Sequence, residues 1–252
     1  LKEGGSAVDA AIAVQAVLTL VEPESSGIAG GAFMLHWVPA GKKLDAYDGR
    51  ETAPRGATPD MFLDGKKQPL GIKDAVLSGR SVGVPGVLRM LWLAHEEHGH
   101  LPWKVLFAPA IRLAEQGFRI SPKLAASIAR DPALASMPVV QDYFFVKDTS
   151  GKRVALPAGA LLKNPELAAT LKLIAEKGPD GFYTGPVAQK IVDMVAHAPA
   201  LPGTLSLADL AAYEAKHREP ICRPYRDYNV CTMPPPTSGG ITTLQILGIL
   251  EH

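Results

Sequence analysis

Two short apolar segments joined by a turn constrain this chain more than any other feature. Residues 33–38 (FMLHWV) and 44–48 (LDAYD) are separated by PAGKK, which favours a turn, so the sequence predicts a β-hairpin. Arg50 follows the return strand, and Pro54 stops that strand from continuing. A guanidinium at a strand end can bind a carboxylate through two parallel hydrogen bonds. The alternative is a surface arginine paired with an acidic neighbour, Asp48 or Glu51.

The composition sets the broad class of the protein. Hydrophobic residues make up 47% of the 252 positions and charged residues 20%, which is typical of a globular chain with one large domain or two small ones. The 26 basic and 25 acidic residues leave a net charge of +1, and no basic cluster stands out, so no nucleic-acid surface is expected. No uninterrupted apolar stretch reaches the roughly 18–20 residues that a membrane span needs.

Caps and apolar periodicity predict helices through most of the chain. Residues 6–20 are apolar nearly all round, which indicates a buried helix, and Ser6 with Asp9 forms a variant of the capping box. Residues 55–83 carry many glycines and prolines and predict a long irregular loop. Because helices fill the middle of the chain and strands mark both ends, the expected class is α+β. Further helices are expected at residues 85–98, 102–116, 122–130, 165–177, 187–197 and 207–213, the last capped by Ser206 and Asp209.

The two cysteines, Cys222 and Cys231, flank a sequence that could form a hairpin. If Arg226 and Asp227 are its two-residue loop, the cysteines face each other on a close, non-hydrogen-bonded pair, where a disulfide is geometrically possible. Neither loop residue favours the positive φ of a type I′ turn, so two separate buried thiols are an equal alternative. A disulfide would indicate an oxidising compartment.

Residues 79–83 (GRSVG) match the G-x-S-x-G pattern of a serine nucleophile. A short strand at residues 75–77 and a helix beginning at Pro85 would give Ser81 the strand–turn–helix context of an α/β-hydrolase. No HGG-type oxyanion segment precedes the motif, and the downstream half lacks repeated strand–helix alternation. The favoured interpretation is therefore a glycine-flexed loop, and a serine esterase is the competing function.

Two further segments suggest ligand sites but favour simpler explanations. Residues 95–100 (HEEHGH) place His95 and His98 three positions apart, not four as in H-E-x-x-H, so a solvated helix end is favoured and no metal site is expected. Gly239 and Gly240, before the last helix, could bind an anion or could allow close packing. The sequence contains no nucleotide-binding glycine motif, and no cofactor is expected.

Six segments of the sequence are distinctive: residues 4–14 (GGSAVDAAIAV), 25–35 (SSGIAGGAFML), 49–54 (GRETAP), 178–185 (GPDGFYTG), 207–213 (LADLAAY) and 233–240 (MPPPTSGG). Taken in this order, they resemble the large chain of the γ-glutamyltransferases (γ-glutamyltranspeptidases) over almost the full length. Several such motifs in the expected order are far more specific than one. Ala29, Ala32 and Thr237 depart from the residues common in that family, but each is a small-for-small change.

The resemblance implies the four-layer αββα fold of the N-terminal-nucleophile hydrolases, with two stacked sheets between layers of helices. In that family a zymogen cuts itself, and a threonine at the new N-terminus of the small chain becomes the nucleophile. Residues 1–252 would be the large-subunit part of a single domain, which a downstream small chain completes as a heterodimer. The sequence starts at Leu1, and a helical pattern continues to His252, so we expect a chain truncated at both ends.

The resemblance also implies an activity. The family transfers the γ-glutamyl group of glutathione-like donors to water, an amino acid or a peptide through an acyl-enzyme. Its arginine for the donor's α-carboxylate corresponds to Arg50, and no catalytic nucleophile is expected within this chain. The family's usual export implies a periplasmic or secreted protein.

Three other functions stay open at this point. A cephalosporin or glutaryl acylase of the same fold would keep Arg50 and change the donor. A serine esterase would use Ser81, and a non-enzymatic binding protein would keep the fold alone. The residues that follow position 252 would separate these cases, because a threonine at a self-cleavage junction supports the transferase or the acylase.

Overall fold

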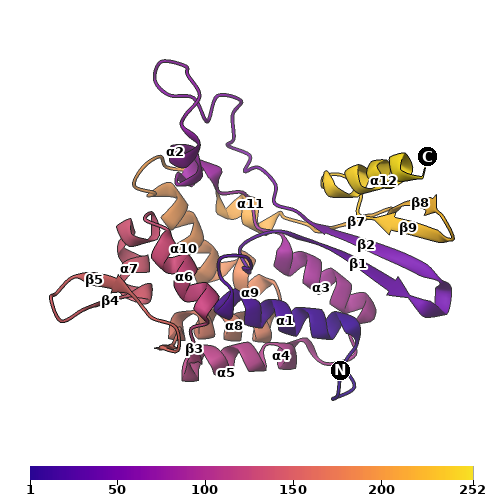
Figure 1. The fold of residues 1–252 in the computed structure, drawn as a ribbon, viewed down its shortest axis with the longest axis horizontal. Coiled ribbons are helices and arrows are strands. Elements are labelled where there is room, and N and C mark those ends of the chain that lie inside the picture. The colour runs from indigo at the N-terminus through magenta and orange to yellow at the C-terminus, as the bar shows by residue number, and fades with distance from the viewer. Residues whose placement is uncertain (252) are drawn as a thin grey trace.

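A three-stranded antiparallel sheet contains the predicted hairpin. A computed structural model describes residues 1–251, and His252, at the end of the expected helical pattern, lies outside the described residues. The strands β1 (Ala32–Val38), β2 (Lys43–Gly49) and β7 (Lys216–Arg218) pair in the order β1-β2-β7 (Figure 1). Lys42 takes a left-handed φ of 46° in the turn between β1 and β2. The hairpin prediction is confirmed.

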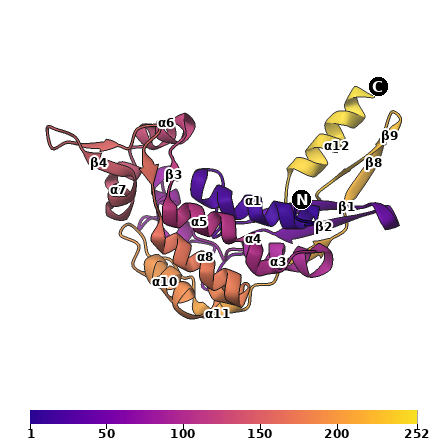
Figure 2. The same cartoon turned by 90° about the horizontal axis from the view of Figure 1, so that it is seen from below.

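Helices cover one face of this sheet. The helices α1 (Ala7–Val21) and α3 (Val87–His98) pack against each other, and α3 also lies against β1 and β2 (Figure 2). Side chains alternate between the two faces of a strand, so Met34 and Tyr47 point toward this helical layer, where Tyr47 is fully buried. Leu35 and Trp37 point to the opposite face and are 41% and 52% exposed.

The remaining helices build the rest of the body. One continuous apolar core joins most of them to α1 and α3, and a second, smaller core lies around α5 and α6. These helices are α4 (Trp103–Leu106), α5 (Ala108–Gln116), α6 (Pro122–Arg130), α7 (Pro138–Phe144), α8 (Pro165–Lys177), α9 (Asp180–Tyr183), α10 (Gly185–Ala196) and α11 (Leu207–Ala211). The predicted helices at residues 122–130 and 165–177 therefore have the expected bounds.

Three two-stranded ribbons stand at the edges of the molecule. The last ribbon and the final helix α12 (Gly239–Leu250) stand apart from the body beside the sheet (Figures 1 and 2). The sequence predicted only this last ribbon, because strands of two or three residues carry too little periodicity to be recognised. The ribbons pair β3 (Phe118–Arg119) with β6 (Leu161–Leu162), β4 (Phe145–Lys147) with β5 (Arg153–Ala155), and β8 (Ile221–Tyr225) with β9 (Tyr228–Thr232).

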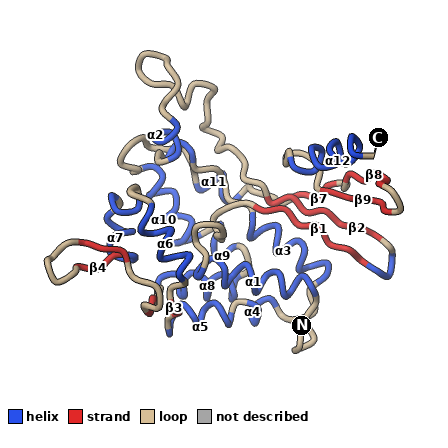
Figure 3. Tube along the Cα trace, viewed as in Figure 1, coloured by secondary structure: helices blue, strands red, loops and turns tan. Residues whose placement is uncertain are grey.

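The long segment after the sheet is largely irregular, as predicted for residues 55–83, and it forms the tan excursion beside α2 in Figure 3. Its one α-helix is α2 (Ile72–Val76), which the N–H of Ala75 helps to form by donating to the carbonyl of Gly71. The short strand at residues 75–77, which the esterase alternative would need, is therefore absent.

Several helix boundaries differ from the prediction, among them the start of α3 and the middle of the helix expected at residues 102–116. The helix α3 begins at Val87, with Gly86 as its N-cap, so Pro85 precedes the helix and does not lie in its first turn. The N–H groups of Gly86 and Val87 both donate to the carbonyl of Gly30, which ties the start of α3 to the turn before β1. The helix expected at residues 102–116 is divided at Phe107 into α4 and α5.

Both predicted capping boxes are present. The Ser6 hydroxyl accepts from the N–H of Asp9, and the Asp9 carboxylate accepts from the N–H of Ser6. Ser206 and Asp209 make the same reciprocal pair at the start of α11. Each box satisfies backbone donors that the first turn of a helix leaves free, which explains why these two starts were predictable from local sequence.

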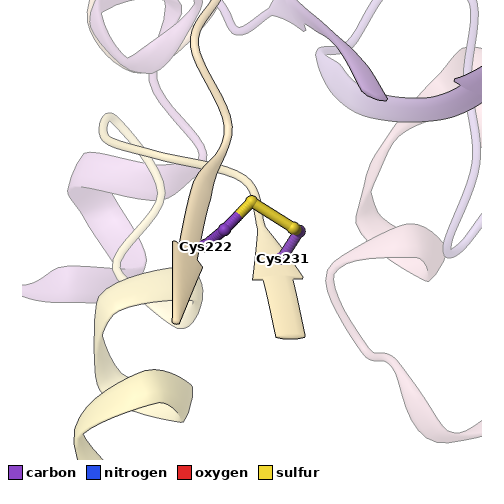
Figure 4. The surroundings of a disulfide bond; sticks show 2 residues. All are labelled: Cys222 and Cys231. Carbon is purple, nitrogen blue, oxygen red and sulfur yellow. A yellow bond between two sulfur atoms is a disulfide. The ribbon is translucent and has the colours of Figure 1, made fainter. Parts of the chain in front are cut away.

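Cys222 and Cys231 form a disulfide between β8 and β9 (Figure 4). They face each other in the predicted register, with Cα atoms 4.1 Å apart, as expected for a close non-hydrogen-bonded pair. Arg226 adopts a φ of 51° in the loop, so this arginine takes up a left-handed conformation that its residue type does not favour. The structure decides the open choice in favour of the disulfide.

Candidate functional site

The backbone of Arg50 is held on both sides where it leaves β2. Its N–H donates to Oδ1 of Asp48 at 2.8 Å, and its carbonyl accepts from the hydroxyl of Tyr213 at 2.7 Å. Its side chain is 60% exposed, and Nη1 lies 3.6 Å from Oε2 of Glu51. A rigid backbone thus carries an accessible guanidinium with a single loose ion pair.

Asp48 is not the partner of the Arg50 guanidinium. The buried Asp48 carboxylate accepts two hydrogen bonds from Arg218 on β7, from Nε at 2.9 Å and from Nη2 at 2.7 Å. Both bonds end on the same oxygen, Oδ2, and charge-assisted hydrogen bonds of this kind are strong. Of the two acidic neighbours that the sequence suggested for Arg50, only Glu51 pairs with it, and the Arg50 donors are largely free.

The short helix α11 holds both ends of the segment that follows Arg50. Tyr213, just beyond α11, bonds to the Arg50 carbonyl, and Oδ1 of Asp209 accepts from the N–H of Arg55 at 3.1 Å. Burial alone would raise the pKa of Asp209, but the Ser206 hydroxyl and the Arg55 N–H outweigh it and lower that pKa. Asp209 therefore stays ionised and keeps accepting these bonds at neutral pH.

Two glycines allow the close approach of segments around Arg50. A Cβ on Gly86 would lie 2.1 Å from the Tyr213 hydroxyl oxygen and 2.2 Å from the carbonyl oxygen of Gly49. A Cβ on Gly31 would lie 2.3 Å from Oε2 of Glu51. Since real Cβ atoms do not come so close, the glycine-rich turn before β1 and the start of α3 must lack side chains here.

Arg50 borders two hollows. The smaller has a volume of about 220 Å³ and lies between the end of β2, β7 and the 233–240 loop; the larger, of about 380 Å³, lies toward the irregular loop. The smaller is lined by Asp48, Arg50, Glu51, Thr52, Tyr213, Glu214, Lys216, Arg218 and Pro236. Four of the six segments that carry the family resemblance therefore meet at Arg50. The segments 49–54, 207–213 and 233–240 line the smaller hollow, and the segment 25–35 contributes Gly31, which lies against Glu51.

Ser81 lacks the setting of a nucleophile. It ends the 3₁₀ helix η2 (Gly79–Ser81), and its hydroxyl donates to backbone carbonyls, at 3.0 Å from that of Val76 and 2.9 Å from that of Ser78. Within residues 1–251 no histidine bonds to it. The segment before it is helical, so the strand–turn–helix premise of the esterase interpretation is wrong and the loop interpretation holds.

The two histidines of the 95–100 segment diverge. His95 Nε2 lies 2.8 Å from the Leu101 carbonyl oxygen, whereas His98 Nε2 lies 3.1 Å from Oδ2 of Asp45 on β2. The segment by itself therefore forms no pair of metal ligands. Gly240 supports the packing interpretation of the double glycine, since a Cβ there would lie 2.0 Å from the Met233 carbonyl oxygen.

The family model for gamma-glutamyltranspeptidase matches residues 1–252. The chain belongs to the gamma-glutamyltranspeptidase family. It is 41% identical over 252 residues to the "Glutathione hydrolase proenzyme" of Bacillus subtilis (strain 168), which covers all of this chain and 42% of that protein.

A solved member of the family has the same fold. The crystal structure of Helicobacter pylori gamma-glutamyltranspeptidase superposes with a TM-score of 0.91 at 34% identity, over 99% of this chain and 69% of that one. The match confirms the expected class, α+β with the αββα fold of the N-terminal-nucleophile hydrolases. The three-stranded sheet and its helical layer are this chain's share of that gamma-glutamyltranspeptidase fold.

The relatives include one with a different name. The "Acylase ACY 1 proenzyme" of Pseudomonas sp. (strain SE83) is 37% identical over 263 residues, which cover all of this chain and 44% of that protein.

The chain spans about two fifths of the length of the curated gamma-glutamyltranspeptidase relatives that it matches. Among the described residues, no helix combines the length and the apolar character needed to cross a bilayer.

The sequence did not point to the residues that hold Arg50. Tyr213 lies in a segment that carries the family resemblance, but nothing near it connects it to Arg50, which is 163 positions away. Arg218 lies outside all six segments, and its bond to Asp48 spans 170 positions. The Tyr213–Arg50 and Arg218–Asp48 contacts become visible only once β2 is known to pair with β7. A strand as short as β7, with three residues, has no sequence pattern from which that pairing could be predicted.

Proposed function

We propose that this chain is the large chain of a γ-glutamyltransferase that transfers or hydrolyses the γ-glutamyl group of glutathione-like donors. The observation that carries the proposal is the exposed guanidinium of Arg50 on a backbone anchored by Asp48 and Tyr213, beside a hollow of about 220 Å³. The donor's α-carboxylate would accept two parallel hydrogen bonds from this guanidinium. Membership of the family and the glutathione hydrolase relatives support the assignment.

In this proposal Arg50 acts far from the bond that breaks. The hydroxyl of a small-chain threonine attacks the γ-carbonyl carbon, the C–N bond of the donor breaks, and the leaving amine takes a proton. Water or an amine then attacks the ester and restores the hydroxyl. By holding the α-carboxylate, Arg50 converts binding energy into orientation of the γ-carbonyl. Glu51, at 3.6 Å, would direct the guanidinium toward the hollow.

The partner that we propose is the small chain of the same precursor. Leu35 and Trp37 leave the outer face of the sheet apolar and exposed, and the exposed Ile246, Ile249 and Leu250 do the same on α12. Exposed apolar surfaces of this kind are typical of interaction sites. In a four-layer fold, a second sheet from the small chain would cover the face that carries Leu35 and Trp37.

The acylase alternative can be separated from this proposal by donor choice. Both γ-glutamyl and glutaryl donors carry a carboxylate for Arg50, but only the γ-glutamyl group carries an α-ammonium. With full-length, self-cleaved protein, we expect p-nitroaniline release from γ-glutamyl-p-nitroanilide to exceed that from the glutaryl anilide by about tenfold or more. A preference for the glutaryl donor would support an acylase, and no release from either donor would support a binding protein.

The disulfide supports a proposed location in the periplasm or outside the cell. Bridges such as Cys222–Cys231 persist in oxidising compartments and are rare in the cytosol. Protein isolated without reductant and unfolded in the presence of an alkylating agent should contain no free thiol at these positions. Two alkylated cysteines would argue against an exported protein.

A further inference from the structure

Three side chains with metal-binding chemistry meet beside the β1–β2 hairpin, on the face that α3 covers. His36 and Asp45 are direct cross-strand partners, so their side chains lie on the same face of the sheet. His98 is the last residue of α3 and reaches the same place from the helical layer. Arg50 follows the opposite end of β2, so this cluster is separate from the proposed donor site.

The spacing of the three groups suits a single small cation. One ring nitrogen from each histidine and one carboxylate oxygen of Asp45 all lie within 4.8 Å of one another. His98 Nε2 is 3.1 Å from Oδ2 of Asp45, and the two imidazole rings have centroids 4.2 Å apart. Ligand atoms at about 2.0–2.1 Å from a tetrahedral zinc ion are roughly 3.3–3.4 Å apart, close to the observed nitrogen–oxygen distance.

One buried polar atom of the cluster has no hydrogen-bond partner among the described residues. This atom is Nδ1 of His36. Burying a polar atom without a partner costs free energy, and such atoms in native proteins usually mark a ligand or a function.

The charged groups around the cluster are compatible with a bound cation. Lys43 pairs with Oδ1 of Asp45 at 2.7 Å, but its side chain is 72% exposed and can turn away into solvent. The other oxygen, Oδ2, is the one that faces His98. Glu97 adds a second carboxylate, with Oε2 at 3.8 Å from His98 Nε2, and this oxygen also accepts a hydrogen bond from the Tyr47 hydroxyl. Two carboxylates thus lie near the His98 nitrogen.

We propose that His36, Asp45 and His98 bind one divalent transition-metal ion of the zinc type. Two imidazoles and one carboxylate favour borderline metals such as Zn²⁺ over Mg²⁺ or Ca²⁺, which prefer all-oxygen sites. A fourth position is left for water. The ion links β1, β2 and the C-terminal end of α3, so its role is to brace the hairpin against the helix rather than to take part in acyl transfer.

The experiment uses full-length, self-cleaved protein stripped with a chelator and dialysed. Zn²⁺ is titrated by calorimetry, Co²⁺ is followed by its visible absorption, and Mg²⁺ and Ca²⁺ serve as probes of selectivity. The ligand variants are His98→Gln, His36→Gln and Asp45→Asn, each checked for the wild-type circular dichroism spectrum. The matched control is His197→Gln, because His197 also lies at a helix end, where its Nδ1 atom contacts only the Asp193 carbonyl of its own helix.

We expect wild type and His197→Gln to bind one equivalent of Zn²⁺, to give the strong visible bands of tetrahedral Co²⁺ and to ignore Mg²⁺ and Ca²⁺. Each ligand variant should lose affinity by about tenfold or more, and Zn²⁺ should raise the thermal midpoint of the wild type but not of His98→Gln. No saturable Zn²⁺ binding would overturn the proposal and leave an ordinary hydrogen-bonded cluster. Binding that survives all three substitutions would overturn it as well, since the ion would then lie elsewhere.

Discussion

The hydroxyl of Tyr213 donates a hydrogen bond to the backbone carbonyl of Arg50, 163 positions earlier in the chain, at 2.7 Å. Burial, together with the Asp48 and Glu51 carboxylates, raises the pKa of Tyr213 to about 12, so the phenol keeps the proton that it donates. The Tyr213 hydroxyl lies against Gly86, where any side chain would collide with it. It therefore links the orientation of Arg50 to the packing of α3 and α11.

The first prediction concerns this bond. Tyr213→Phe keeps the ring and its stacking on Tyr183 but removes the hydroxyl, leaving the Arg50 carbonyl without its partner. We expect a loss of about 1 kcal/mol in the free energy of unfolding. We also expect a several-fold fall in kcat/KM for a γ-glutamyl donor, because the guanidinium is held less rigidly. Urea unfolding and steady-state kinetics measure the two effects, and unchanged values in both would contradict an anchoring role.

The second prediction concerns Arg50 itself. Arg50→Ala removes a charge-assisted pair with the donor, so we expect a loss of roughly 3–5 kcal/mol in transition-state stabilisation, or about 10²–10³-fold or more in kcat/KM. Arg50→Lys should recover only part of this loss, since an ammonium cannot form two parallel hydrogen bonds. Kinetics with γ-glutamyl-p-nitroanilide measure both variants.

Self-cleavage provides the internal comparison for Arg50. It needs no external carboxylate, so both Arg50 variants should still mature, as judged by gel electrophoresis. The control is Arg130→Ala, because the Arg130 guanidinium bonds only to the Ala126 carbonyl within its own helix, α6. Near-wild-type kcat/KM in a mature Arg50→Ala protein would mean that the donor binds elsewhere.

A third prediction separates the transferase from an esterase. Ser81→Ala removes a hydroxyl that donates to two backbone carbonyls and leaves no buried charge unpaired. We expect kcat/KM for the γ-glutamyl donor to stay within a few-fold of the wild type. A true nucleophile would lose several orders of magnitude, and a loss on that scale in folded protein would restore the esterase interpretation.

The fourth prediction is a pH dependence of stability. Oδ2 of the buried Asp9 accepts from the N–H groups of Ser6, His100 and Leu101, at 2.9, 3.0 and 3.0 Å. Burial alone would raise the pKa of Asp9, but these three bonds, with His95, lower it. The folded pKa therefore lies below the unfolded value of about 3.9, so the stabilisation is complete above that value and declines as the pH falls through it toward the folded pKa.

Asp9→Asn tests this linkage, because it keeps the shape and removes the charge. Its thermal midpoint should be lower than that of the wild type at pH 7, by an amount that corresponds to about 1–3 kcal/mol. The gap should narrow as the pH falls from about 5 to 3. Asp131→Asn, at an exposed carboxylate that accepts from the N–H of Ala133, is the control. Parallel curves for Asp9→Asn and the wild type would contradict the assignment.

Much of the fold was predictable where local chemistry decides it. Ser6 and Asp9 satisfy each other within one turn, the β1–β2 hairpin is closed by its own turn, and Gly117 ends α5 with a left-handed φ of 97°. Phe107 shows the limit of this approach. The helix expected through it divides there, because Pro109 in the first turn of α5 lacks the N–H that would bond to the Val105 carbonyl. The buried Phe107 ring packs against Trp103 at this break, at a centroid distance of 4.8 Å.

The candidate site was predictable only in part. Arg50 follows from its place after a strand and from the family resemblance, but the partners that orient it follow from neither. Asp48 and Arg218 meet only because β7 adds to the edge of β2. The metal-binding chemistry of His98 was similarly hidden, since its neighbours His36 and Asp45 come from the hairpin and not from its own sequence motif.

The dependence of Arg50 on late residues bears on how the protein is made. A ribosome completes the β1–β2 hairpin early, yet Tyr213 and Arg218, which anchor Arg50 and Asp48, emerge more than 160 residues later. Because domains are synthesised from the N-terminus, a nascent chain that stops before α11 carries Arg50 on an unsupported strand end. The proposed donor-binding surface is therefore absent from any shorter intermediate and forms only when nearly the whole of this chain is available to fold.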